Sequence, residues 1–157
     1  MTIKEHSILA AQPFMRGLSS EQVAVLAGLT CHVSLPAQVR LFEEGSTADK
    51  FWLIDAGRVA LDAMVPGHGR VIIEMLGRGD VIGLSWLLPP YQWRFGAVTT
   101  APLQAFELDG RGVREACVAD LALGSELNRR FIAVMVRRLQ ATRDRLLEAC
   151  AHPELLP

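Results

Sequence analysis

Residues 45–57 read GSTADKFWLIDAG, an apolar stretch with a glycine at each end. Phe51 and Leu53 stand two positions apart, so in an extended strand their side chains point to the same face of a sheet. Gly45 and Gly57 suit the turns that must begin and end such a strand, because glycine adopts backbone angles that other residues avoid. The stretch therefore predicts a buried strand between two turns.

Similar short runs continue on both sides of this stretch, with turn-forming residues between them. Two of the expected turns are Ala56-Gly57 and Ala101-Pro102. Many short strands without intervening helices are typical of a closed roll, so we expect a mainly β fold, a double-stranded β-helix or jelly-roll β-roll. The expected strands are Cys31–Leu35, Val39–Phe42, Phe51–Asp55, Val59–Met64, Val71–Leu76, Val98–Thr100 and Leu103–Leu108.

Helical patterns flank the strands. Ser19 with Gln22 three residues later forms a capping-box pattern before an apolar run. Asp109 and Asp120 are expected to cap a short helix and a long C-terminal helix. The expected organisation is a single domain over 1–150, with an N-terminal helical part (1–28), the β-roll (30–108) and C-terminal helices (109–150), followed by a tail at 151–157.

The long helix carries two apolar stripes. Phe131, Val134 and Ala141 are expected to cover the roll. A second line has apolar or small residues at alternating spacings of three and four, as in a coiled-coil seam. This line predicts a homodimer through the C-terminal helix, and the alternative is a single wide stripe buried within the monomer. The seam residues are Ile132, Met135, Leu139, Thr142, Leu146 and Ala149.

Composition narrows the protein class. The 157 residues are 50% hydrophobic, and 16 basic residues nearly balance 17 acidic ones, which fits one globular domain and excludes a disordered chain. Cys31, Cys117 and Cys150 lack CxxC spacing, so we expect buried, inert thiols in a reducing cytoplasm. We expect no signal peptide, because the N-terminus MTIKEHSILA has a lysine and a glutamate but no long apolar core. We expect no membrane span, because the longest stretch without Asp, Glu, Lys or Arg, residues 22–39, contains several polar residues.

The order of elements and three motifs resemble the cyclic-nucleotide-binding domain of the Crp/Fnr (catabolite activator) family, over about residues 12–150. The first motif is the stretch at 45–57. The second is the family's phosphate-binding cassette, because residues 79–98 read GDVIGLSWLLPPYQWRFGAV and align with Crp-like members without a gap. The third is RRLQAT at 137–142, which is similar to the Crp-like Arg-Arg-Leu-Gln-x-Thr.

The resemblance implies a ligand site. Backbone N–H groups from Gly83 to Ser85, at a helix start, would donate to a cyclic phosphate, and Arg94 would add a charge-assisted contact. The threonine at 142 matches the family residue that reaches the base across the dimer interface. The implied ligand is cyclic AMP or cyclic GMP, or another small anion, and no cofactor or metal is required. The candidate ligand-binding residues are Gly83, Leu84, Ser85, Arg94, Phe95 and Thr142.

Two cassette positions depart from the family. Leu84 replaces a glutamate that accepts a hydrogen bond from the ribose 2′-hydroxyl, which costs about 1–3 kcal/mol in a dry site. Phe95 replaces a small or hydroxyl residue that supports the phosphate, and its ring could fill the phosphate's space. An arginine without these helpers still binds an anion but no longer specifies a cyclic ribose phosphate.

Four aromatic residues surround the Pro89-Pro90 pair of the cassette. They either form a remodelled pocket for a planar ligand or plug the pocket and pack the loop on the roll. We expect the second arrangement, because apolar positions inside a roll are normally core. These residues are Trp86, Tyr91, Trp93 and Phe95.

The chain shows no catalytic machinery. It has no serine elbow, GxGxxG or P-loop pattern, too few cysteines for an iron–sulfur cluster, and dispersed histidines at 6, 32, 68 and 152. Segment 125–150 holds six arginines against three acidic residues, which either contact nucleic acid or form a solvated helix face. Only seven residues follow Cys150, so we expect no helix-turn-helix and no sequence-specific DNA binding by this polypeptide.

Three functions remain. The first is a cytoplasmic sensor or regulatory module, not an enzyme, that relays a ligand signal through its C-terminal helix to a partner protein. The second is a ligand-free interaction scaffold whose degenerate, aromatic-filled pocket is sealed by Leu84, Trp93 and Phe95. The third is a cupin-like enzyme, which would need histidines clustered around a metal.

Overall fold

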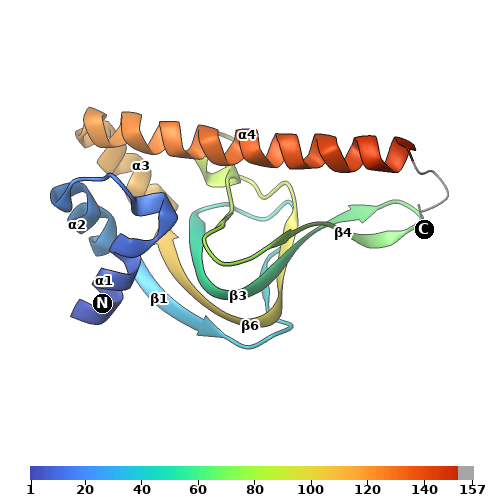
Figure 1. Cartoon of the computed structure of the whole chain (residues 1–157), viewed down its shortest axis with the longest axis horizontal. Helices are drawn as coiled ribbons and strands as arrows, with labels where there is room; N and C mark the ends of the chain where they lie inside the picture. The colour runs from blue at the N-terminus through green and yellow to red at the C-terminus, as the bar shows by residue number, and fades with distance from the viewer. Residues whose placement is uncertain (152–157) are drawn as a thin grey trace.

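A computed structural model describes residues 1–151, so the expected tail beyond Ala151, with His152, lies outside the described residues. The fold is mainly an antiparallel sheet with flanking helices and a long C-terminal helix, as expected (Figure 1). In chain order the elements are α1 (Ile3–Ala11), η1 (Pro13–Met15), α2 (Ser20–Gly28), β1 (Thr30–Leu35), β2 (Arg40–Phe42), β3 (Lys50–Val65), β4 (Gly69–Leu76), β5 (Val81–Ile82), η2 (Ser85–Leu87), β6 (Gly96–Asp109), α3 (Gly110–Ala119) and α4 (Leu121–Ala151).

The sheet is built around two long strands, β3 and β6, which pair antiparallel along most of their length. The order is β1-β6-β3-β4, with β2 on β6 and β5 on β3. Expecting turns at Ala56-Gly57 and Ala101-Pro102 was wrong, because each pair lies inside a continuous strand where the register shifts. Gly57 has a φ of +102°, and a Cβ there would lie 2.2 Å from the Pro102 carbonyl oxygen. The two strands therefore bend together at this contact.

Helices α2, α3 and α4 begin directly after the predicted capping residues Ser19, Asp109 and Asp120. The Ser19 hydroxyl accepts from the Gln22 amide, and the Gln22 side chain accepts from the Ser19 amide, which completes a capping box. Asp109 accepts from the amide of Arg111 at the start of α3, and Asp120 accepts from amides in the first turn of α4. Figure 1 shows α4 running along one side of the roll, with α1 and α2 at one end and the β3–β4 hairpin at the other.

The first half of α4 packs on the roll through the expected residues Phe131 and Val134, which are buried. The ring of Phe131 lies 4.8 Å from Phe14, 5.5 Å from Phe51 and 5.3 Å from Trp86, measured between centroids. The expectation that Ala141 also covers the roll was wrong, because every residue from 139 to 148 is exposed. Beyond Arg138 the helix has left the apolar core.

Most side chains of the proposed seam are exposed to solvent. The side chains of Ile132, Met135, Leu139 and Leu146 are 55%, 41%, 71% and 63% exposed. Thr142 is exposed as well. The alternative of one wide stripe buried within the monomer is therefore wrong, whereas dimerisation through this seam stays a prediction.

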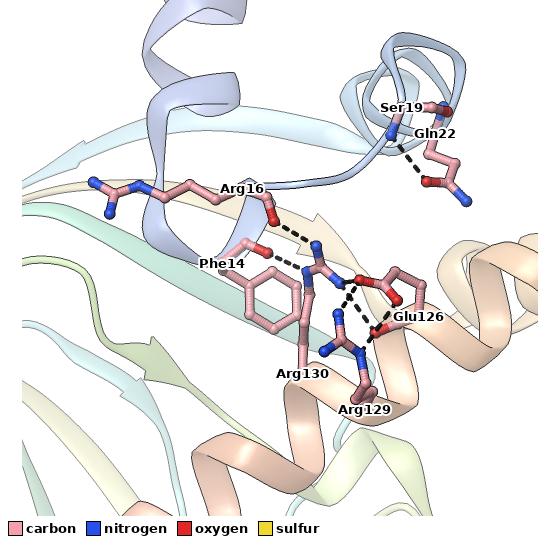
Figure 2. A network of polar contacts seen from close by, with 7 residues as sticks. All are labelled: Phe14, Arg16, Ser19, Gln22, Glu126, Arg129 and Arg130. Atoms are coloured by element: carbon pink, nitrogen blue, oxygen red, sulfur yellow. Dashed lines mark hydrogen bonds and ion pairs between the residues drawn. The ribbon is translucent and has the colours of Figure 1, made fainter.

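Arg130 of α4 forms hydrogen bonds to the N-terminal segment at residues 14–16 (Figure 2). Its guanidinium donates to the backbone carbonyl of Phe14 at 2.8 Å and to that of Arg16. It also pairs with Glu126 one turn earlier, which binds Arg129 as well. These hydrogen bonds hold the pKa of Glu126 down at about 2, those from Arg129 contributing most. The network joins two segments more than a hundred residues apart in the sequence.

The thiols were wrongly expected to be buried. Cys31 and Cys150 are exposed, because Cys31 lies on the outward side of β1 and Cys150 lies near the end of α4. Cys117 is half-buried, and burial raises the pKa of its thiol. Among the helices of residues 1–151, none is both long and apolar enough to cross a membrane.

Candidate functional site

A cavity of about 700 Å³ lies between the roll and α4. Its size falls within the roughly 300–1,000 Å³ of small-molecule sites. All six residues expected to bind a ligand line this one cavity, although they come from three parts of the chain: Gly83, Leu84, Ser85, Arg94, Phe95 and Thr142. Because Leu84, Trp93 and Phe95 line the cavity and leave this volume open, they do not seal it.

The turn after β5 forms one wall. Gly83 has a φ of +86°, and a Cβ there would lie 2.7 Å from the Trp93 ring, so both the backbone angle and the space require glycine. The amides of Gly83, Leu84 and Ser85 donate to no backbone or side-chain acceptor within residues 1–151. Three successive amide donors without protein acceptors are suited to hold an anionic oxygen.

Arg94 is exposed at the rim of the cavity. Its guanidinium forms no ion pair with any carboxylate of the described residues. The neighbouring Phe95 is 44% exposed and also lines the cavity. Arg94 is therefore available to an anionic ligand without first breaking a bond within the protein.

The four cassette aromatics divide into core and pocket residues. Trp86 and Trp93 are 1% and 4% exposed, and each stacks on a phenylalanine of the roll, at 4.7 Å from Phe51 and 3.8 Å from Phe42 respectively. For these two the expectation of core packing was right. It was wrong for Phe95, because this ring lies at the rim of an open cavity.

Tyr91 packs against α3. Its ring lies 4.2 Å from the guanidinium carbon of Arg114, a cation–π contact. The same arginine donates to the backbone carbonyl of Trp86 at 2.6 Å. Through these two contacts, Arg114 of α3 binds the loop on both sides of the Pro89-Pro90 pair, at Trp86 and at Tyr91.

Helix α4 forms the wall facing the cassette and contributes, besides the expected Thr142, two arginines that were not expected to bind a ligand. Arg138, Thr142 and Arg145 follow one another at spacings of four and three, so they share a face of the helix. Arg138 donates to the Val81 carbonyl, and its Nε lies 3.8 Å from Oε2 of Glu74 on β4. Burial lowers the pKa of Arg138 below its usual range.

Thr142 and Arg145 are linked to each other, because an Nη of Arg145 donates to the Thr142 hydroxyl at 3.2 Å. The spacing of Arg138 and Arg145 around Thr142 could have shown from the sequence that the three share a helix face. The pairing of Glu74 with Arg138 depends on tertiary packing and could not. Three arginines and a single carboxylate therefore line the cavity, which favours a negatively charged ligand. Within residues 1–151, no three His, Cys, Asp or Glu side chains gather as metal ligands would.

Comparisons with known proteins place the chain in a family. A family model described as the cyclic nucleotide-binding domain matches residues 32–120, more than half of the chain. The CRP-like cAMP-activated global transcriptional regulator of Mycobacterium tuberculosis is 24% identical over 141 residues, which are 90% of this chain and 61% of that protein. The chain thus spans about three fifths of the length of this curated relative.

Solved structures share the fold. A cyclic nucleotide-binding domain from Methylobacillus flagellatus aligns with a TM-score of 0.78 and 22% identity, over 98% of this chain and 84% of that one. The catabolite activator protein of Thermus thermophilus aligns with a TM-score of 0.68 and 22% identity, over 88% of this chain and 63% of that one. The chain belongs to the cyclic nucleotide-binding domain family.

Proposed function

We propose that this protein is a cytoplasmic sensor module that binds a cyclic nucleotide, or another small phosphorylated anion, in the cavity beside Arg94. The observation that carries the proposal is the meeting of an unpaired guanidinium with three successive free amides around one open cavity. A phosphate between Arg94 and the Gly83–Ser85 turn would receive charge-assisted hydrogen bonds from both sides.

The rest of the ligand would lie against the apolar wall and α4. Leu84 offers no acceptor to a ribose hydroxyl, and Glu74 is the one carboxylate among the residues that line the cavity. Glu74 is 19% exposed and weakly paired with Arg138 at 3.8 Å, so one of its oxygens can accept from a ligand hydroxyl. The Phe95 ring and the Thr142 hydroxyl provide a flat face and a polar contact for a base. These contacts make Glu74 the proposed replacement for the missing cassette glutamate.

The signal would leave through α4. This helix supplies Arg145 and two seam residues, Leu139 and Thr142, to the cavity. The other large apolar seam residues, Ile132, Met135 and Leu146, are exposed. A ligand that binds one position of α4 better than another shifts the population toward that position. We propose that α4 forms a homodimer and that a partner protein responds to the shift. The cyclic AMP-activated relative from Mycobacterium tuberculosis supports a regulatory role of this kind.

Isothermal titration with cyclic AMP and with cyclic GMP tests the ligand. We expect binding heat with at least one nucleotide, and at least a tenfold loss of affinity in Arg94→Ala, because a charge-assisted hydrogen bond is worth about 1.5–3 kcal/mol. Arg58→Ala is the matched control, since Arg58 is an exposed arginine on β3 that does not line the cavity. Absence of heat with both nucleotides, or equal losses in the two variants, would overturn the cyclic-nucleotide proposal.

The second candidate is a ligand-free interaction scaffold, and the exposed apolar seam of α4 favours it because exposed apolar surface is suited to bind another protein. A ligand that binds only the folded protein must raise its melting temperature. The scaffold therefore predicts the same melting temperature with and without millimolar cyclic AMP, cyclic GMP or inorganic phosphate. A rise that is lost in Arg94→Ala would reject it.

A further inference from the structure

A second hollow lies at the opposite end of β5 from the cassette turn. It has a volume of about 520 Å³ and is bounded by α1, by η1 and the residue after it, and by the turn between β4 and β5. Lys4, Arg16 and Arg78 line it together with Asp55 and Gln12. None of these five residues lines the cavity beside Arg94. The two cavities are therefore separate.

The hollow has an excess of positive charge. Lys4, Arg16 and Arg78 are exposed, and none of them forms an ion pair with a carboxylate of residues 1–151. The one carboxylate of the lining, Asp55, is half-buried, and its Oδ1 accepts from the Gln12 amide at 3.1 Å. Gln12 is 5% exposed, so this bond is held by the core. Like charges without partners repel, and an anion between them would relieve that repulsion.

The backbone of two of the three basic residues, Arg16 and Arg78, is held in place by hydrogen bonds to other parts of the fold. The Arg16 carbonyl accepts from Arg130 of α4, and Figure 2 shows the Arg16 side chain pointing away from that network. Arg78 lies in a turn closed by hydrogen bonds from the Gly77 amide to the Asp80 carboxylate, at 2.8 Å, and from the Gly79 amide to the Ile54 carbonyl, also at 2.8 Å. An anion bound here therefore has little backbone to order, which favours affinity.

We propose that this hollow is a second binding site, for a soluble anion that carries two linked phosphoryl groups. Two guanidinium groups can each take a phosphate edge in a bidentate way, and a lysine ammonium adds a point charge. Several oxygens spread over two phosphorus centres match three separate cations better than a single carboxylate does. The proposal does not depend on the function proposed for the cavity beside Arg94.

Titration with sodium pyrophosphate at constant ionic strength tests the site. The reference protein is Arg94→Ala, which removes one of the two arginines of the first cavity that form no ion pair, and we expect it to bind one pyrophosphate. Adding Arg78→Ala or Arg16→Ala should weaken binding about tenfold or more, since each removes a charge-assisted contact. Arg16→Ala keeps the carbonyl that binds Arg130, so the fastening of the N-terminal segment is retained. Adding Arg58→Ala instead, as the matched control, should leave affinity within about twofold.

A further variant should raise the affinity. Asp55→Asn removes the one negative charge of the hollow and keeps an oxygen for Gln12, so we expect tighter pyrophosphate binding, an effect that a merely structural role of Asp55 would not produce. Circular dichroism checks that each variant is folded. The proposal is overturned if Arg94→Ala binds no pyrophosphate, if affinity survives both added arginine substitutions, if Arg58→Ala lowers it equally, or if folded Asp55→Asn binds more weakly.

Discussion

Replacing Phe131 by alanine tests how α4 is attached to the roll. The Phe131 side chain is 1% exposed, and its ring contacts three other aromatic rings at centroid distances of 4.8–5.5 Å. Truncating a buried phenylalanine to alanine typically costs about 3–5 kcal/mol, and loss of the aromatic pairs favours the upper part of that range. With a urea m value near 2 kcal/mol/M, the unfolding midpoint should fall by roughly 1.5–2.5 M.

The matched control is the next residue of the same helix. Ile132 is 55% exposed on the outward side of α4, so Ile132→Ala should change the unfolding free energy of the monomer by no more than about 0.5 kcal/mol. Urea unfolding followed by tryptophan fluorescence at low protein concentration measures both variants, and Trp86 is a probe beside the substituted ring. A loss below about 1 kcal/mol in Phe131→Ala, or equal losses in the two variants, would refute the account of α4 packing.

Three further substitutions test the seam, the N-terminal network and the strand bend. Leu139→Glu places a charge in the proposed seam and should turn a dimer into a monomer in light scattering; an unchanged mass would reject the seam. Glu126 has a folded pKa of about 2 against 4.5 normally, so its stabilisation is complete above about pH 4.5 and is lost as the pH falls toward 2. The stability difference between wild type and Glu126→Gln should shrink over that interval in urea unfolding, and a constant difference would contradict the assignment. Gly57→Ala should destabilise the protein by more than about 1 kcal/mol in the same assay, because its Cβ would lie 2.2 Å from the Pro102 carbonyl oxygen; a neutral effect would reject the strained bend.

Local sequence patterns predicted those features that depend on neighbouring residues. The cassette at 79–98 is one continuous stretch, so its comparison with the family grouped the Gly83 turn with Arg94, and both line the same cavity. The capping residues of the helices could also be predicted from the sequence, because a capping side chain accepts a hydrogen bond from an amide only two or three positions away.

The sequence patterns did not predict features that arise from tertiary packing between distant segments. Gly57 and Pro102 each resemble a turn when read alone, but they face each other across two paired strands and form a shared bend. Glu74 reaches the cavity because β4 lies opposite α4, and no local pattern connects it with Arg138. Ala141 has the right spacing for core packing, yet the helix has passed the end of the core at that point.

The most direct test of the central claim is a titration of the amide signals of Gly83, Leu84 and Ser85 in ¹H–¹⁵N correlation spectra. If a phosphate binds between these free amides and Arg94, adding cyclic AMP or cyclic GMP should shift all three signals in a saturable way. The same titration of Arg94→Ala should leave them unmoved at equal nucleotide concentration. Unchanged signals in the wild-type protein, or shifts confined to residues outside the cavity, would contradict the account.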